Sequence, residues 1–238
     1  MISSIIEGAI KMNIDSPILI TGCPRSGTSL IAGIINLSGA DGGEMYGECR
    51  ANKKGMFENK KIREEICKPF LRSIAADPLG QDPLPNIDEV KEFSDEFINN
   101  WREKVLDIIS NKKWRNNQYK EIWFYKGAKM CLMWPIWHRA FPDAKWIVVR
   151  REDEKIIDSC LNTPFMRAFQ NREDWQEWIG EHKKRFEEMK QERLDIIEIW
   201  TQDIINGQFE SIKNFIEQNG LFWNEEKVRN FISKELWH

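Results

Sequence analysis

Short apolar runs and longer periodic stretches alternate along the 238 residues of the chain. The short runs are rich in Ile, Val and aromatic residues, which is typical of strands buried on both faces. They predict strands at 18–21, 122–125 and 145–149. The longer stretches place apolar residues three or four positions apart, the period of an amphipathic helix. They predict helices at 29–37, about 62–70, 90–108, 132–141 and 174–200, and two more in the tail, through 209–216 and 228–232.

This alternation predicts an α/β fold of the P-loop type. We expect three layers, with a mainly parallel sheet covered by helices on both faces. The length suits a single domain over 1–238. Three prolines make 77–88 a connector, and the segment at about 77–118 is interpreted as a helical cap insertion.

The strongest local pattern is the segment from Gly22 to Ser29, with the sequence GCPRSGTS, between the first predicted strand and the first helix. The backbone N–H groups of such a loop, with a helix N-terminus behind them, form an anion site. The segment fits the spacing of a nucleoside-triphosphate loop, but Thr28 stands where that loop needs a lysine. Arg25 instead offers a forked, permanent positive charge to a smaller anion such as a phosphosulfate.

Residues 24–30, with the sequence PRSGTSL, resemble the 5′-phosphosulfate-binding loop of the sulfotransferase superfamily. The resemblance implies an enzyme that takes a sulfuryl group from 3′-phosphoadenosine 5′-phosphosulfate (PAPS) and releases adenosine 3′,5′-bisphosphate (PAP), without a metal. The cytosolic branch has a tryptophan that stacks on adenine where this chain has Leu30, so the stacking residue is not identified. The residues implied to hold the 5′-phosphosulfate are Arg25, Ser26, Gly27, Thr28 and Ser29.

A second segment of the same superfamily binds the 3′-phosphate, through an arginine at a strand end and a serine eight residues later. Arg151 and Ser159 fit that spacing, and Arg150 lies one residue farther from the serine. Successive strand residues point to opposite faces, so we expect one of the two arginines to meet the ligand. We assign this role to Arg151 and keep Arg150 as the alternative.

The catalytic base is harder to assign by resemblance. Cytosolic sulfotransferases place a histidine two residues after a lysine at a strand end. Here Lys126 is present, but Ala128 stands in the place of the histidine. The general base of that branch is therefore missing, although its lysine is retained.

Other branches use a glutamate from the segment after the first helix, and this chain offers Glu44, Glu48 and Glu58 there. Residues 52–58, with the sequence NKKGMFE, resemble an Asn-Pro-Lys-Gly-x-x-Glu stretch of bacterial sulfotransferase-like proteins. We expect Glu48 or Glu58 to be the general base, while Lys126 and Arg25 stabilise the leaving phosphate and the transferred group.

Composition narrows the range of partners. A net charge of −3 argues against a nucleic-acid surface, and the apolar runs are too short for membrane insertion. Five scattered cysteines without a C-x-x-C pair indicate reduced thiols in a cytoplasmic protein, with no zinc site. We expect a small-molecule or carbohydrate acceptor with a hydroxyl or amine group, and the sequence does not identify it.

Two other functions stay open at this point. A non-catalytic module that binds a 3′-phosphoadenosine nucleotide would explain the missing histidine. A P-loop kinase or NTPase would need the absent loop lysine and a carboxylate for magnesium at a strand end.

Overall fold

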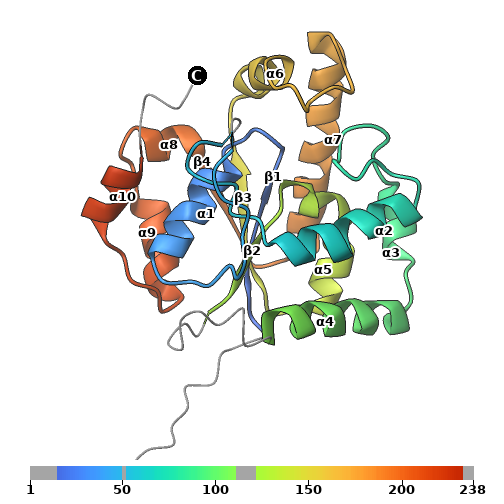
Figure 1. Ribbon diagram of the computed structural model, residues 1–238, viewed down its shortest axis with the longest axis horizontal. Coiled ribbons are helices and arrows are strands. Elements are labelled where there is room, and N and C mark those ends of the chain that lie inside the picture. The colour runs from blue at the N-terminus through green and yellow to red at the C-terminus, as the bar shows by residue number, and fades with distance from the viewer. Residues whose placement is uncertain (1–14, 50–51, 111–121, 233–238) are drawn as a thin grey trace, which may run out of the picture.

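A computed structural model describes residues 15–49, 52–110 and 122–232 of the chain (Figure 1). Its described part contains one sheet of four parallel strands in the order β2-β1-β3-β4. The strands are β1 (Ile18–Gly22), β2 (Phe124–Lys126), β3 (Lys145–Arg150) and β4 (Ile196–Trp200). The first three strands confirm the strands predicted from the short apolar runs, because such runs can be buried on both faces of a parallel sheet.

Alternate residues of each strand pack into two different apolar cores. In β1, Ile18 and Ile20 lie in one core and Leu19 in the other, and in β3 Ile147 and Trp146 divide in the same way. This alternation is the period of two that a strand imposes on its side chains. The sheet therefore needs a cover of helices on each face.

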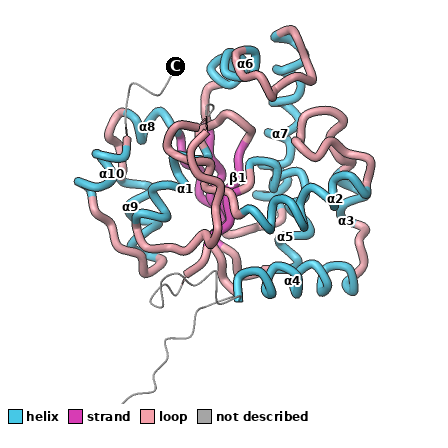
Figure 2. Tube along the Cα trace, viewed as in Figure 1, coloured by secondary structure: helices cyan, strands magenta, loops and turns pink. Residues whose placement is uncertain are grey.

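The two helical layers stand on opposite sides of the sheet in Figures 1 and 2. The first layer consists of α1 (Thr28–Leu37), α8 (Thr201–Ile205), α9 (Glu210–Gln218) and α10 (Glu225–Phe231). The second consists of the π-helix η1 (Ile62–Cys67), α2 (Lys68–Ser73), α3 (Ile87–Lys91), α4 (Asp95–Ser110), the 3₁₀-helix η2 (Ala128–Met133), α5 (Trp134–Ala140) and α7 (Arg172–Gln191). A smaller core joins α6 (Asp153–Leu161) to α7. This arrangement confirms the predicted three-layer α/β fold.

The strand order brings the two predicted anion-binding segments together. β1 lies between β2 and β3, so the chain after β1 and the chain after β3 lead to opposite edges of the sheet. In parallel α/β sheets, ligands bind where such connections diverge, at the carboxyl ends of the strands. The loop at 22–27 follows β1 and Arg151 follows β3, so both segments begin at this point.

The prediction of one helix over 174–200 was wrong. α7 ends at Gln191, Arg193 has a left-handed φ of 59°, and Ile196–Trp200 forms β4 beside β3. Ile197 and Trp200 happen to fall at helical spacing from Met189, which explains the error. The run of Ile residues in this segment suits a strand as well, and its pairing with β3 decides the outcome.

The stripe at 90–108 is divided between two helices. α3 ends at Lys91 and α4 begins at Asp95, where the Ser94 hydroxyl accepts a hydrogen bond from the backbone N–H of Phe97. The proposed cap insertion at 77–118 contains both helices, and its residues 111–118 lie outside the described part. Among the described residues, no helix is long and apolar enough to cross a membrane.

Candidate functional site

The loop after β1 presents unbonded backbone donors at the start of α1. Arg25 and Gly27 have left-handed φ angles of 74° and 95°. Within the described residues, the backbone N–H groups of Gly27, Thr28 and Ser29 have no recorded acceptor. Free N–H groups at a helix N-terminus attract anions, so the loop has the geometry of a phosphate or sulfate site.

The hydroxyl of Ser26 adds a further unused group to this loop. Ser26 is buried, and its Oγ atom makes no hydrogen bond to any of the described residues. A Cβ added to Gly22 would lie 2.8 Å from this oxygen and 2.6 Å from the carbonyl oxygen of Val149, so only glycine fits there. An orphaned hydroxyl is unfavourable in a dry interior, and an anion in the loop would be a partner for it.

Arg151 and Ser159 meet Arg25 beside the loop, although both are more than 100 residues from Arg25 in the chain. The Arg25 Nε donates to the Ser159 Oγ at 2.9 Å, and the Arg151 Nη1 donates to the backbone oxygen of Arg25 at 3.0 Å. We call this group the arginine site.

The arginine site is electrostatically unfavourable on its own. Burial lowers the pKa of Arg25, and burial followed by the charge of Arg25 lowers the pKa of Arg151. The left-handed φ of Arg25 costs about 1–3 kcal/mol in a residue with a side chain. Two poorly solvated cations and a strained backbone at one place favour the binding of an anion.

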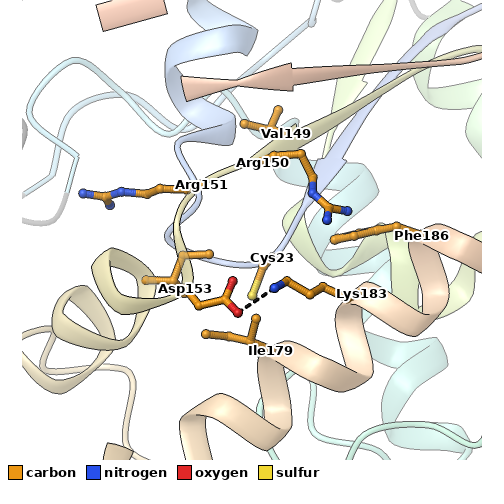
Figure 3. Close-up of a pocket in the computed structure, with 9 residues that line it drawn as sticks. Cys23, Val149, Arg150, Arg151, Asp153, Ile179, Lys183 and Phe186 are labelled. Carbon is orange, nitrogen blue, oxygen red and sulfur yellow. Dashed lines mark hydrogen bonds and ion pairs between the residues drawn. The ribbon is translucent and has the colours of Figure 1, made fainter. Parts of the chain in front are cut away.

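Arg150 lies on the other face of the strand. Its Nη1 pairs with the Oε1 of Glu198 at 3.2 Å, and its guanidinium lies 5.2 Å from the centroid of the Phe186 ring. Figure 3 shows the side chain of Arg150 turned toward Phe186 and that of Arg151 turned in the opposite direction. Arg151 is thus the arginine of the pair that contacts the loop.

The segment between α6 and α7 lies beside Arg25. The guanidinium of Arg25 lies 5.9 Å from the centroid of the Phe165 ring, which is 41% exposed. The buried amide of Gln81 donates to the Phe165 oxygen at 2.8 Å and accepts from the backbone N–H groups of Arg167 and Ala168. Gln81 therefore holds the segment 165–168 in its position beside Arg25.

A second cluster of charges lies at the end of β2. The Lys126 Nζ is 3.2 Å from the Oε1 of Glu58, and the Arg63 Nε is 2.7 Å from its Oε2. Glu58 is only 4% exposed. Burial alone would raise its pKa, but Lys126, Lys129 and Arg63 together lower the pKa to about 2.

The carboxylate of Glu64 completes this cluster. It pairs with Arg63 and, at 2.8 Å, with Lys68. We call the whole group the Glu58 cluster: Glu58, Arg63, Glu64, Lys68, Lys126 and Lys129. It is held together by the fold, since its members come from η1, α2, β2 and η2 and from the segment before η1.

The other two glutamates of the same segment lie at the surface. Glu44 pairs with Lys60 at 2.9 Å, and Glu48 is exposed directly before Cys49, which pairs with Asn52. The Ser29 hydroxyl donates to the backbone oxygen of Met56 at 3.2 Å, so this segment is attached to the start of α1.

A comparison with protein-family models identifies the family of the chain. The model of the sulfotransferase family matches residues 17–221. The chain belongs to this sulfotransferase family. No curated protein matches it in sequence.

Solved structures of other sulfotransferases share its fold. The sulfotransferase STF9 from Mycobacterium avium superposes with a TM-score of 0.55 at 14% identity, over 92% of this chain and 68% of that one. The sulfotransferase domain of the Synechococcus PCC 7002 olefin synthase superposes with a TM-score of 0.54 at 13% identity, over 97% and 83%. At these identities the likeness shows the fold alone.

The site of this sulfotransferase also contains residues that the sequence did not single out. The Thr201 hydroxyl lies between the backbone oxygens of Ser26 and Arg150, at 2.8 Å from the latter, and so ties the end of β4 to the loop. Thr201 was missed because β4 was taken for a helix. Gln81 was missed because its contacts join segments more than 80 residues apart in the chain. Arg63 and Lys129 were missed because no local pattern distinguishes them from surface charges.

The predicted residues thus fall into three groups. Arg25, Ser26, Gly27, Thr28 and Ser29 form one loop, and Arg151 and Ser159 meet it. Lys126 and Glu58 contact each other in the Glu58 cluster, whereas Arg150 and Glu48 lie away from these contacts. Among the described residues, no group of three or more His, Cys, Asp or Glu side chains gathers as metal ligands do.

Proposed function

We propose that this sulfotransferase transfers a sulfuryl group from PAPS to a hydroxyl or amine of a small-molecule or carbohydrate acceptor, and releases PAP. The observation that carries the proposal is the meeting of Arg25, Arg151 and Ser159 at the loop after β1. Membership of the sulfotransferase family supports the reaction class. A cytoplasmic location stays a prediction from the sequence.

The residues present fit both phosphate groups of such a nucleotide. The N–H groups at 27–29 and the orphaned hydroxyl of Ser26 suit the 5′-phosphosulfate. Arg151 and Ser159 suit the 3′-phosphate, because a guanidinium and a hydroxyl both donate to phosphate oxygens. Arg25 contacts Ser159 and belongs to the loop, so it can serve either group.

PAPS supplies an activated sulfuryl group when it is bound. In the transfer, the bond between sulfur and the acceptor oxygen or nitrogen forms while the bond between sulfur and the 5′-phosphate oxygen breaks. The protein has to align the acceptor, neutralise the charge that develops on the 5′-phosphate, and take up the acceptor's proton. Lys126 and Arg25 are the cations that we assign to charge neutralisation.

We assign the uptake of the acceptor's proton to Glu58. Its carboxylate accepts a hydrogen bond from Lys126, forms an ion pair with Arg63, and keeps lone pairs for a further donor. With a pKa of about 2 it is always ionised near neutral pH but is a weak base. If Lys126 turns toward the sulfuryl group, one of the cations that lower this pKa moves away, and Glu58 becomes a stronger base. Glu48 remains the alternative base.

The donor is tested by thermal unfolding with PAP, ADP and ATP, each with and without magnesium. Ligand binding to the native state raises Tm according to its affinity. We expect the largest rise with PAP and no dependence on magnesium. A larger rise with ATP and magnesium would replace the proposal with a P-loop kinase or NTPase.

The base is tested by PAPS-dependent sulfate transfer in E58Q and E48Q. We expect E58Q to lose transfer by about 100-fold or more while it still binds PAP, and E48Q to retain it. Full transfer in E58Q with loss in E48Q would reassign the base. PAP binding without transfer in the wild-type protein, across a broad acceptor panel, would indicate a non-catalytic binding module.

A further inference from the structure

Lys129 is a buried lysine that makes no direct ion pair. It is 6% exposed, and among the described residues its ammonium has no hydrogen bond and no carboxylate within ion-pair distance. The backbone around Lys129 is held in place by neighbouring segments. The Thr21 hydroxyl bonds to the backbone oxygens of Gly127 and Ala128 at 3.1 Å, and a Cβ on Gly80 would lie 3.1 Å from the Lys129 Cβ.

The nearby carboxylates are already engaged by other cations. Both oxygens of Glu58 are taken, by Lys126 and by Arg63, and Glu64 pairs with Arg63 and Lys68. The Glu58 cluster contains four cations and two carboxylates, so two positive charges are unbalanced. Burial, and then Arg63 and Lys126, lower the pKa of Lys129, while Glu58 raises it.

Lys129 belongs to the Glu58 cluster and not to the arginine site. It follows the end of β2 by three residues, and β2 lies beside β1 on the side away from β3. The arginine site instead joins the chain after β1 to the chain after β3.

A buried lysine without a direct ion pair is unfavourable, and a ligand carboxylate or phosphate would compensate for it. We propose that the acceptor is itself an anion, and that its carboxylate, phosphate or sulfate group pairs with Lys129 while its hydroxyl or amine faces Glu58 and Lys126. This inference rests on the proposed function and adds the chemical class of the acceptor. It makes Lys129 a specificity-determining residue.

The test uses matched acceptors that differ in one negative charge. The pairs are 4-hydroxybenzoate with 4-hydroxybenzyl alcohol, glucuronate with glucose, and 3-hydroxybutyrate with 1,3-butanediol. Binding is measured as the rise in Tm of the protein saturated with PAP, so that the nucleotide site is filled. Where transfer from PAPS occurs, kcat/KM is measured as well.

The variant K129M removes the unpaired charge and keeps the apolar stem, so we expect it to fold. The matched control is K68M, which removes a lysine of the same cluster that is already paired with Glu64. A general positive potential would be weakened equally by both variants, whereas a specific contact would be lost only in K129M. K129Q is a second variant that keeps a polar group at the position.

We expect the acidic member of at least one pair to bind about 10- to 100-fold more tightly in the wild-type protein, as for a charge-assisted hydrogen bond. The preference should disappear in K129M and K129Q and persist in K68M. Equal binding or preference for the neutral members would overturn the inference, and so would a preference that K129M retains. If PAP fails to raise Tm, the proposed donor is wrong, and the same pairs without nucleotide then decide whether the anion site exists.

Discussion

The arginine site and the Glu58 cluster differ in how their charges are balanced. At the arginine site, Arg25 and Arg151 are half-buried, and Arg25 lies on a strained loop. The Arg25 side chain bonds to Ser159, and Arg151 bonds to the backbone oxygen of Arg25. In the Glu58 cluster, the central carboxylate is fully buried and is held by two cations of the protein itself. The first arrangement favours the binding of a charged ligand, and the second favours the folded chain.

The contrast implies that the two regions respond differently to mutation. Changes at the arginine site should alter nucleotide affinity with little loss of stability. Changes at the centre of the Glu58 cluster should alter stability with little effect on nucleotide affinity. The exception within the cluster is Lys129, whose charge the fold leaves unpaired.

The largest expected effect is a loss of stability in E58Q. The substitution leaves buried cations without a counter-charge, which costs about 3–5 kcal/mol in free energy of unfolding at pH 7. Urea unfolding measures it, and E64Q is the control, because Glu64 is 37% exposed and its loss should cost about 1 kcal/mol or less. Equal effects of E58Q and E64Q would contradict the contrast.

The stability difference between the wild-type protein and E58Q should also depend on pH. The folded pKa of Glu58, about 2, lies below its ordinary value of 4.5, so its ionised form is stabilised by folding. The contribution is complete above pH 4.5 and is lost as the pH falls toward 2. The difference in stability between the wild-type protein and E58Q should therefore shrink over this range, and a constant difference would show that Glu58 is not held by these cations.

The next effect is a loss of PAP affinity in R25G, by about 100-fold, because Arg25 serves both halves of the arginine site. Glycine also relieves the left-handed φ, so the unliganded protein should keep its stability to within about 1 kcal/mol. R193G is the control, since Arg193 has a φ of 59° and is exposed elsewhere. Calorimetry and urea unfolding measure the two quantities, and a parallel fall of both in R25G would refute the separation.

A smaller effect is expected for Q81L. Loss of three hydrogen bonds from a buried amide should cost about 1–3 kcal/mol of stability and release the segment that carries Phe165 beside Arg25. Hydrogen exchange at Arg167 and Ala168 should become faster, with a fall in PAP affinity of less than about tenfold. Q81E retains the acceptor and should restore most of the protection at both amides. Unchanged exchange in Q81L would remove Gln81 from this role.

The smallest effect is expected for R150M. Its guanidinium pairs with Glu198 and contacts the Phe186 ring, so about 1 kcal/mol of stability should be lost. PAP affinity should stay within about twofold of the wild-type value, since the group points away from the loop. A loss of affinity in R150M comparable to that in R25G would show that the ligand binds on the face of β3 that carries Arg150, and would contradict its assignment to Arg151.

The sequence predicted one region better than the other for a physical reason. The loop at 22–29 is one continuous stretch of sequence. The strand before it, its glycines and the helix start after it are determined by interactions between residues close together in the chain. β4 was misread because Ile197 and Trp200 satisfy a helical period by coincidence, and only its pairing with β3 distinguishes the alternatives. Thr201 was missed for the same reason, because it directly follows β4.

The Glu58 cluster depends on contacts between distant segments. Glu58 and Lys126 were both named from the sequence, but 68 positions separate them and no local pattern predicts that they pair. Arg63 and Lys129 look like ordinary surface charges in the sequence, which is the usual environment of these residue types. Their burial follows from the packing of η1 and η2 against the sheet.

The central claim is that Arg151 and Ser159 bind the 3′-phosphate of a nucleotide whose 5′-phosphate lies in the loop after β1. Calorimetric titration of the wild-type protein, R151M and R150M with PAP and with 5′-AMP tests it directly, because these ligands differ in the 3′-phosphate. We predict that PAP binds the wild-type protein and R150M about 100-fold more tightly than 5′-AMP, and that this ratio falls to nearly one in R151M. Equal binding of the two nucleotides by the wild-type protein, or the same ratio in R151M, would contradict the account.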